Sequence, residues 1–195
     1  RRIDGGEAAY SDFAVLFRAA HLSRFIEQAL IRANIPYVMW GGVRFFERME
    51  VKDCISYLRL VASDDDLAFE RVINTPSRKV GKVTLELITA YASQEGTTLY
   101  QALKNHIEDP KLNRDALHEF VALIEECRSR AYSMGVCSML EYILEKTGLK
   151  QEYRDDNDEQ RLENITELVD SIRLYESEHT EREQLPLYDY LQDIA

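Results

Sequence analysis

The pattern of apolar and polar residues divides the chain into two parts with different periodicities. From about residue 50 onward, apolar side chains recur every three to four positions in one segment after another, which is typical of amphipathic helices. Before residue 50, short continuous apolar runs flank a single segment with helical spacing. The pattern therefore predicts a mainly α protein, with a small α/β piece followed by an all-α domain.

The first part has the pattern of a βαβ-like unit. The runs Asp12–Phe17 and Tyr37–Trp40 are candidate buried strands, and the segment between them, 21–34, has the spacing of a helix. Asn34 is expected to close this helix, and Pro36 prevents its continuation. Because parallel strands need cover on both faces, we expect the unit to be a slice of a larger α/β domain.

The second part predicts one helix after another. The carboxylates at 64–66 should cap the second of these helices, since they accept hydrogen bonds from first-turn amides. Residues 74–81 predict a turn with Pro76 and Gly81, and residues 152–160 a charged linker. The expected helices cover about 50–62, 67–73, 83–92, 98–106, 112–131, 136–146, 162–175 and 187–194.

The two parts meet in the segment 36–53, PYVMWGGVRFFERMEVKD. Gly41 and Gly42 allow a sharp change of chain direction, so they are candidate hinge residues. We therefore expect two domains, residues 1–49 and residues 50–195.

Composition indicates an ordinary globular protein with 45% hydrophobic residues and no apolar run of about 18 residues that would span a membrane. There is no signal-peptide pattern, and the ends of the sequence suggest an excised piece of a longer protein. Three cysteines at unrelated spacings, Cys54, Cys127 and Cys137, favour reduced, buried thiols over a disulfide or a metal site. We expect a cytoplasmic protein.

The net charge of −11 is concentrated near the C-terminus. Residues 151–195 hold 14 acidic and 4 basic side chains, whereas the first 150 residues hold 21 and 20. Phosphate binding depends on local charge, so the overall acidity does not exclude nucleic acid as a partner of the first 150 residues.

Enzyme motifs are absent from the sequence: it has no GxxxxGK[ST], GxGxxG, GxSxG or HExxH. The four histidines are scattered, and the acidic run 155–159 lacks the glycine and the terminal glutamate of a calcium loop. We expect no catalytic residue, no metal site and no cofactor bound by this segment.

One candidate phosphate-binding site follows the first expected strand. Arg18, Ser23 and Arg24 lie at its carboxyl end, where ligands collect in α/β sheets, and arginine with a hydroxyl suits a nucleic-acid backbone. The alternative is a surface arginine beside a helix-capping turn.

A second candidate is the stretch 75–84, TPSRKVGKVT, between two expected helices. Gly81 would present backbone amides, while Arg78, Lys79 and Lys82 supply positive charge for a phosphate at the N-terminus of the next helix. The alternative is an ordinary charged surface.

Three stretches of the sequence resemble the UvrD/PcrA/Rep group of superfamily 1 DNA helicases. They are DFAVLFRAAHLSR, then ANIPYVMWGGVRFFERMEVKDCISYLRLVASDDDLAFERVINTPSRKVGKVTL, then QRLENITELV. The resemblance implies that residues 1–49 are the end of the first part of motor domain 2A. It implies that residues 50–195 are the helical insertion 2B, a duplex-contacting and regulatory domain.

The resemblance also implies a function for the parent protein: ATP-driven 3′→5′ DNA unwinding in replication-associated DNA metabolism and repair. ATP and Mg²⁺ would be bound by the parent protein outside this segment, which alone is expected to be inactive. Implied partners are DNA, as single strand and duplex junction, and repair or replication proteins; no membrane is involved.

Individual positions follow from the same resemblance. Arg18 and Arg44 match basic residues on the single-stranded DNA track, and Thr84 matches a threonine that contacts the duplex. An asparagine expected on the track is here Ala20. The family's turn, basic-Arg-Gly-Ile-Gly, is here Ser-Arg-Lys-Val-Gly at 77–81, so the position of a glycine is occupied by Lys79.

An alternative function is a helical protein–protein docking or autoinhibitory module of a DNA repair protein. The acidic residues 151–195 favour it, whereas the basic turn favours DNA contact. If DNA is the partner, the acidic helix expected over 158–180 should face away from it.

Overall fold

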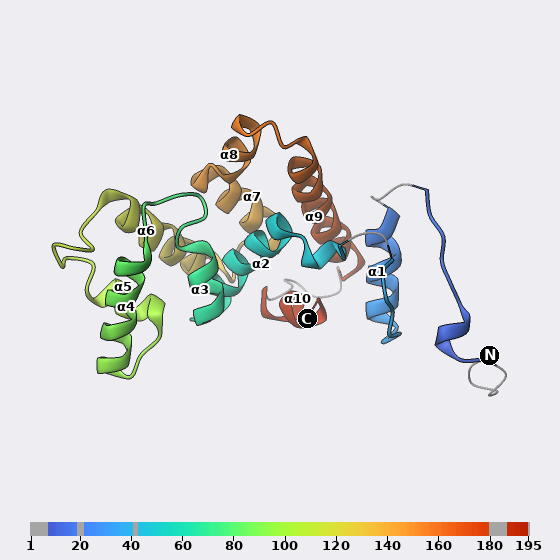
Figure 1. Cartoon of the computed structure of the whole chain (residues 1–195), viewed down its shortest axis with the longest axis horizontal. Coiled ribbons are helices and arrows are strands. Elements are labelled where there is room, and N and C mark those ends of the chain that lie inside the picture. The colour runs from blue at the N-terminus through green and yellow to red at the C-terminus, as the bar shows by residue number, and fades with distance from the viewer. Residues whose placement is uncertain (1–7, 19–21, 41–42, 180–186, 195) are drawn as a thin grey trace.

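A computed structural model of the chain describes residues 8–18, 22–40, 43–179 and 187–194. Within these ranges the protein is mainly α-helical, as predicted, and contains no β-strand (Figure 1). Two short 3-10 turns are η1 (Tyr10–Asp12) and η2 (Phe45–Glu47). The α-helices are α1 (Leu22–Arg32), α2 (Met49–Ala62), α3 (Asp66–Val72), α4 (Lys82–Glu95), α5 (Leu99–Asn105), α6 (Asp115–Arg130), α7 (Val136–Thr147), α8 (Leu149–Asp155), α9 (Glu159–Glu178) and α10 (Leu187–Asp193).

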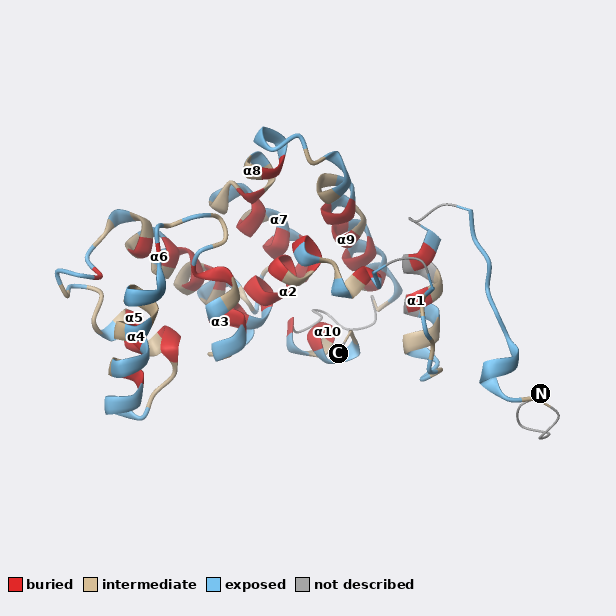
Figure 2. Ribbon diagram, in the orientation of Figure 1, coloured by how far each residue is buried: buried red, intermediate tan, exposed pale blue. Residues whose placement is uncertain are grey.

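Helix α2 is the centre of the core. It packs against α3, α6, α7, α9 and α10, and most of its residues are buried, including Tyr57 and Leu58. Buried residues are concentrated along α2 and on the neighbouring stretches of the helices around it (Figure 2). Helices α4 and α5 pack together as a pair at one end of the molecule, where α5 also contacts α3 (Figure 1).

Local signals placed most helices correctly. Asp65 caps α3, as predicted, because its carboxylate accepts a 2.9 Å hydrogen bond from the Ala68 amide. Asn34 ends the α1 segment in a left-handed conformation, at φ 51°. The linker predicted at 152–160 is wrong for most of its length, because residues 152–155 belong to α8 and residues 159–160 to α9. Helix α8 is fixed by tertiary contacts, since Leu149 and Tyr153 are buried.

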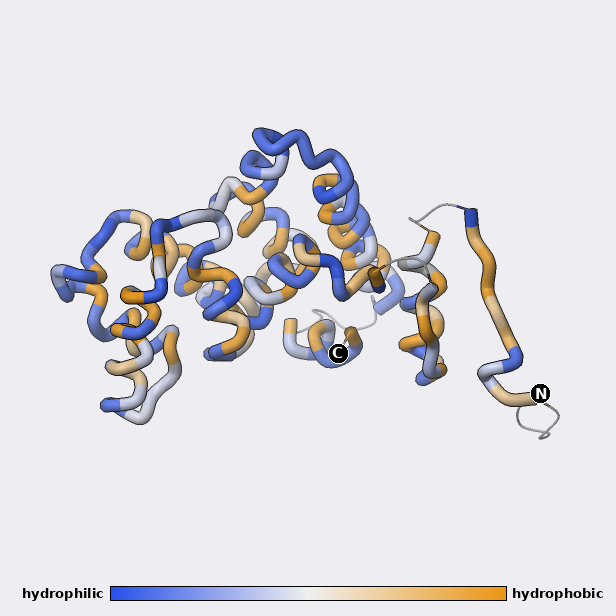
Figure 3. Tube along the Cα trace, in the orientation of Figure 1, coloured by the Kyte–Doolittle hydropathy of each residue, from blue (hydrophilic) through white to orange (hydrophobic). Residues whose placement is uncertain are grey.

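The two segments predicted as strands form no strand in the described part of the chain. Residues 13–17 and 35–39 are neither helical nor paired in a ladder, and a strand is stabilised by hydrogen bonds to a neighbouring strand. The segment before α1 is apolar (Figure 3), yet it is exposed (Figure 2). Leu16 is 93% exposed and Trp40 92%. The mainly α class is therefore confirmed, while an α/β piece is not observed.

Cys54, Cys127 and Cys137 are free and buried, and burial raises the pKa of the Cys127 thiol to about 11. No helix in the described ranges has the length and apolar character that a membrane span requires. The hinge candidates Gly41 and Gly42 lie outside the described residues, as does Ala20, and the boundary at residue 49 stays a prediction.

Candidate nucleic-acid interface

The turn between α3 and α4 is held by an asparagine side chain. The Asn74 Oδ1 atom accepts hydrogen bonds from the amides of Arg78 (2.8 Å) and Val80 (3.0 Å). Val80 is buried beneath the turn, whereas Lys79 between the two bonded amides is exposed. Lys79 adopts φ 57°, the left-handed conformation that favours glycine. This conformation gives a physical reason for a glycine at position 79 in the turn that the sequence resembles.

Arg78 points into the protein. Its Nη1 atom donates to the carbonyl oxygens of Val72 (3.0 Å), Ile73 (3.3 Å) and Pro76 (3.2 Å), and its Nη2 atom donates to the Tyr57 hydroxyl (2.8 Å). A cation at the last carbonyls of α3 also complements the helix dipole. Arg78 therefore stabilises the turn through hydrogen bonds directed into the protein. A direct contact between Arg78 and DNA stays a prediction.

Lys79 and Lys82 are the exposed basic side chains of the turn. The Lys82 side chain retains 89% of its accessible surface despite a 3.7 Å ion pair with Glu86. Lys82 begins α4, and Gly81 is its N-cap without a side-chain hydrogen bond. The Thr84 amide donates to the Gly81 carbonyl (3.0 Å), but the two helix amides before it precede the first intrahelical bond, and no acidic residue stands in this turn. The helix end is therefore suited to an external anion.

Arg114, from a distant part of the sequence, donates hydrogen bonds to two residues of this region. It precedes α6, and its Nη1 atom donates to the Lys79 carbonyl (3.1 Å), while its Nη2 atom donates to the Thr84 hydroxyl (3.2 Å). Sequence reasoning missed Arg114, because no spacing or motif relates a residue 30 positions downstream to the turn.

The other predicted residues lie apart from this turn. Arg18 is exposed beside an open apolar hollow that includes Phe17 and Leu22. Ser23 is buried, with 2% exposure, and the side chain of Arg24 lies outside the described residues. Because the Arg24 side chain is not described, a shared phosphate site of Arg18, Ser23 and Arg24 stays a prediction.

Arg44 is held by Tyr37. Its Nη2 atom donates to the Tyr37 carbonyl (2.9 Å), and its guanidinium lies 4.8 Å from the centre of the Tyr37 ring. The Tyr37 hydroxyl donates to buried Glu27 of α1 (3.0 Å), which also accepts the Phe45 amide (3.1 Å). Burial, together with the hydrogen bond to Glu27, raises the pKa of Tyr37 to about 12. Glu27 was missed by sequence reasoning and connects α1 to η2.

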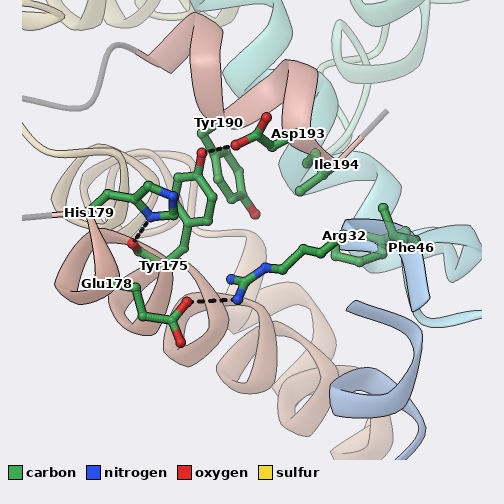
Figure 4. A pocket seen from close by; sticks show the side chains of 9 residues that line it. Arg32, Phe46, Tyr175, Glu178, His179, Tyr190, Asp193 and Ile194 are labelled. Atoms are coloured by element: carbon green, nitrogen blue, oxygen red, sulfur yellow. Dashed lines mark hydrogen bonds and ion pairs between the residues drawn. The ribbon is translucent and has the colours of Figure 1, made fainter. Parts of the chain in front are cut away.

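A pocket of about 340 Å³ lies where α1, α9 and α10 meet (Figure 4). Its polar groups are largely paired with one another. Arg32 forms a 2.7 Å ion pair with Glu178, the Tyr175 hydroxyl donates to Asp193, and His179 Nδ1 lies 2.8 Å from the Tyr175 carbonyl. In the described ranges no cluster of three or more histidine, cysteine or acidic side chains is arranged to hold a metal ion.

The helical fold and the basic turn are accompanied by similarity to known proteins over the whole chain. The family model of the UvrD-like helicase C-terminal domain matches residues 1–195, and the chain belongs to this family.

Three curated relatives carry the same similarity. DNA helicase II of Escherichia coli (strain K12) is 35% identical over 194 residues, covering 96% of this chain and 27% of the relative. DNA helicase II of Haemophilus influenzae is 40% identical over 169 residues, covering 83% and 23%. ATP-dependent DNA helicase PcrA of Bacillus subtilis (strain 168) is 33% identical over 196 residues, covering 97% and 26%. The chain thus spans about a quarter of the length of these relatives.

Proposed function

We propose that this chain is the duplex-contacting and regulatory part of an ATP-dependent 3′→5′ DNA helicase. Residues 50–195 would form the helical 2B domain, and residues 1–49 the adjoining end of the first part of motor domain 2A. ATP and Mg²⁺ would bind to parts of the helicase outside this sequence, which contains no phosphate-binding loop motif. In this role the chain would not hydrolyse ATP by itself.

The observation that carries the proposal is the exposed basic turn at the start of α4. Lys79 and Lys82 extend outward beside a helix end that no side chain caps. Lysines and helix N-termini contact phosphates without reading bases, and such contact suits an enzyme that must act on any sequence. Thr84, in the first turn of α4, adds a hydroxyl to the same group.

The exposed apolar residues before α1 support the 2A assignment. Phe13, Val15 and Leu16 are each more than half exposed in an extended segment, and so are Val38 and Trp40 after α1. Short apolar runs exposed in this way suit strands that the rest of a motor-domain sheet would cover. Residues 12–17 and 37–40 would then pair within that sheet.

The test is binding of the 195-residue chain to forked DNA over a range of salt concentrations. Lys79→Ala/Lys82→Ala should weaken binding at least about tenfold. The plot of log K against log[salt], which has a negative slope, should also become shallower by about 0.9 for each phosphate that is no longer neutralised. Arg78 is left unchanged because its replacement would disturb the turn itself.

The matched control removes two positive charges from α8, a helix outside the turn. Lys150→Ala/Arg154→Ala, on α8, gives the same net charge and should weaken binding by less than about threefold. Equal binding by the two double variants would contradict a DNA contact at this turn. That result would favour the docking-module alternative, in which the acidic residues 151–195 face a protein partner.

A further inference from the structure

The guanidinium of Arg114 joins two sides of the basic turn that are separate in the sequence. One terminal nitrogen donates to the backbone carbonyl of Lys79 and the other to the side-chain hydroxyl of Thr84. The Nε atom of Arg114 is buried, so this part of the guanidinium is shielded from solvent. Arg114 is therefore aimed at the turn rather than extended toward solvent like Lys82.

This contact determines what the Thr84 hydroxyl offers to a ligand. A threonine hydroxyl has one hydrogen to donate and two lone pairs to accept with, whereas arginine is only a donor. Since Arg114 donates to Thr84 Oγ1, the hydroxyl hydrogen is left for another acceptor. The same guanidinium binds the Lys79 carbonyl oxygen, whose negative end would otherwise repel a phosphate nearby.

We propose that Arg114 is a positioning residue for a DNA phosphate at the N-terminus of α4. It holds Thr84 as a hydrogen-bond donor and fixes the backbone of Lys79, without contacting the phosphate itself. This inference rests on the proposed DNA-binding function and adds a residue to that site from outside the turn.

Arginine is required at this position because two acceptors must be reached at once. Its planar fork places two nitrogens at fixed positions, while a lysine ammonium is a single point on a flexible stem. Arg114→Lys keeps the positive charge but removes the bridge between Lys79 and Thr84. The DNA affinities of Arg114→Lys and Arg114→Ala should therefore agree within about twofold.

The experiment measures forked-DNA affinity and its salt dependence for four forms of the chain: unchanged, Arg114→Ala, Thr84→Val and the double variant. Arg114→Ala should weaken binding about five- to tenfold with an unchanged salt slope, because the charges that neutralise the phosphates all remain. In the Thr84→Val background, Arg114→Ala should weaken DNA binding only about twofold, because much of its effect depends on the Thr84 hydroxyl. Arg114→Lys provides a variant that retains charge should Arg114→Ala unfold.

Two results would overturn the role of Arg114. One is binding by Arg114→Ala and Arg114→Lys within about twofold of the unchanged chain, while Lys79→Ala/Lys82→Ala weakens it. The other is a slope of log K against log[salt] that is shallower by about 0.9 in Arg114→Ala than in the unchanged chain, which would make Arg114 a direct phosphate contact. If Lys79→Ala/Lys82→Ala itself binds normally, the proposed function fails instead, so the two failures are distinguishable.

Discussion

The described residues before Phe45 and those from Phe45 onward contain similar apolar side chains but differ in how far these side chains are buried. Every buried apolar side chain in the described part of the chain belongs to residue 45 or later. Among the side chains described before residue 45, the buried ones are polar, namely Ser23 and Glu27. Leu16 is 93% exposed, while Leu58 is fully buried in α2. Hydrophobic content alone therefore does not determine which segment contributes to the core.

The two regions differ in whether other described parts of the chain cover their apolar side chains. An amphipathic helix has one apolar face, and the helices around α2 cover one another's faces within this chain. A short run that is apolar on both sides needs a neighbouring strand and layers above and below it. The described residues supply neither for 13–17, so its side chains stay in solvent.

The largest effect should come from removing the same side chain in the two regions. Leu58→Ala should lower the free energy of unfolding by about 2–5 kcal/mol, because it leaves a cavity in the core. Leu16→Ala should change it by less than about 0.5 kcal/mol, because the side chain is already in water. Denaturant unfolding of both variants measures the contrast. A comparable decrease in the two would mean that Leu16 is covered in solution.

A second contrast compares two cations of the basic turn. Arg78→Ala should lower the free energy of unfolding by about 2–3 kcal/mol, because it leaves partly buried carbonyl oxygens without their donor. Lys82→Ala should leave stability within about 0.5 kcal/mol, since its side chain is 89% exposed. Thermal unfolding separates the two. Similar midpoints for both variants would contradict an inward role for Arg78.

A smaller effect concerns Asp53, a carboxyl group inside the helical region. Burial raises the pKa of Asp53 above its ordinary value of 3.8, although the ion pair with Arg71 (2.7 Å) acts in the opposite direction. Because the folded pKa is the higher one, protonated Asp53 stabilises the fold fully below pH 3.8. That contribution is lost as pH rises through the folded pKa.

The measurement is the free energy of unfolding of the unchanged chain minus that of Asp53→Asn, followed from about pH 3.5 to about pH 7. The difference should decrease as pH rises, because asparagine does not titrate over this range. A difference that increases with pH would show that the ion pair with Arg71 dominates and that the pKa is lowered instead.

The smallest effect should come from the backbone of Lys79. Lys79→Gly should raise the free energy of unfolding by about 0.5–1 kcal/mol, since φ 57° is strained for a residue with a side chain. Lys79→Ala removes the same charge but keeps the strain, so it should give no such gain. Forked-DNA affinity should fall equally in both. Equal stability of the two variants would contradict strain at this position.

Much of the helical architecture was predictable because its signals are local. The apolar spacing of residues 162–175 placed α9, and the carboxylate at 65 placed the start of α3. The prediction failed at α8, where charged residues suggested a linker but Tyr153 is buried and donates to Asp53 at 3.3 Å. Such a contact depends on a residue 100 positions away and has no local signal.

The sequence by itself determined where most of the helices lie, that a turn rich in positive charge separates α3 from α4, and that the chain resembles the helicase family to which it belongs. Only the tertiary structure decided the directions of the side chains at that turn: Arg78 points inward to the end of α3, Lys82 points outward, and Arg114 donates to Thr84 from the start of α6. The reason is physical. Helix formation depends on residues three or four positions apart, whereas the direction of a long side chain depends on which carbonyls and hydroxyls the packed helices bring within its reach.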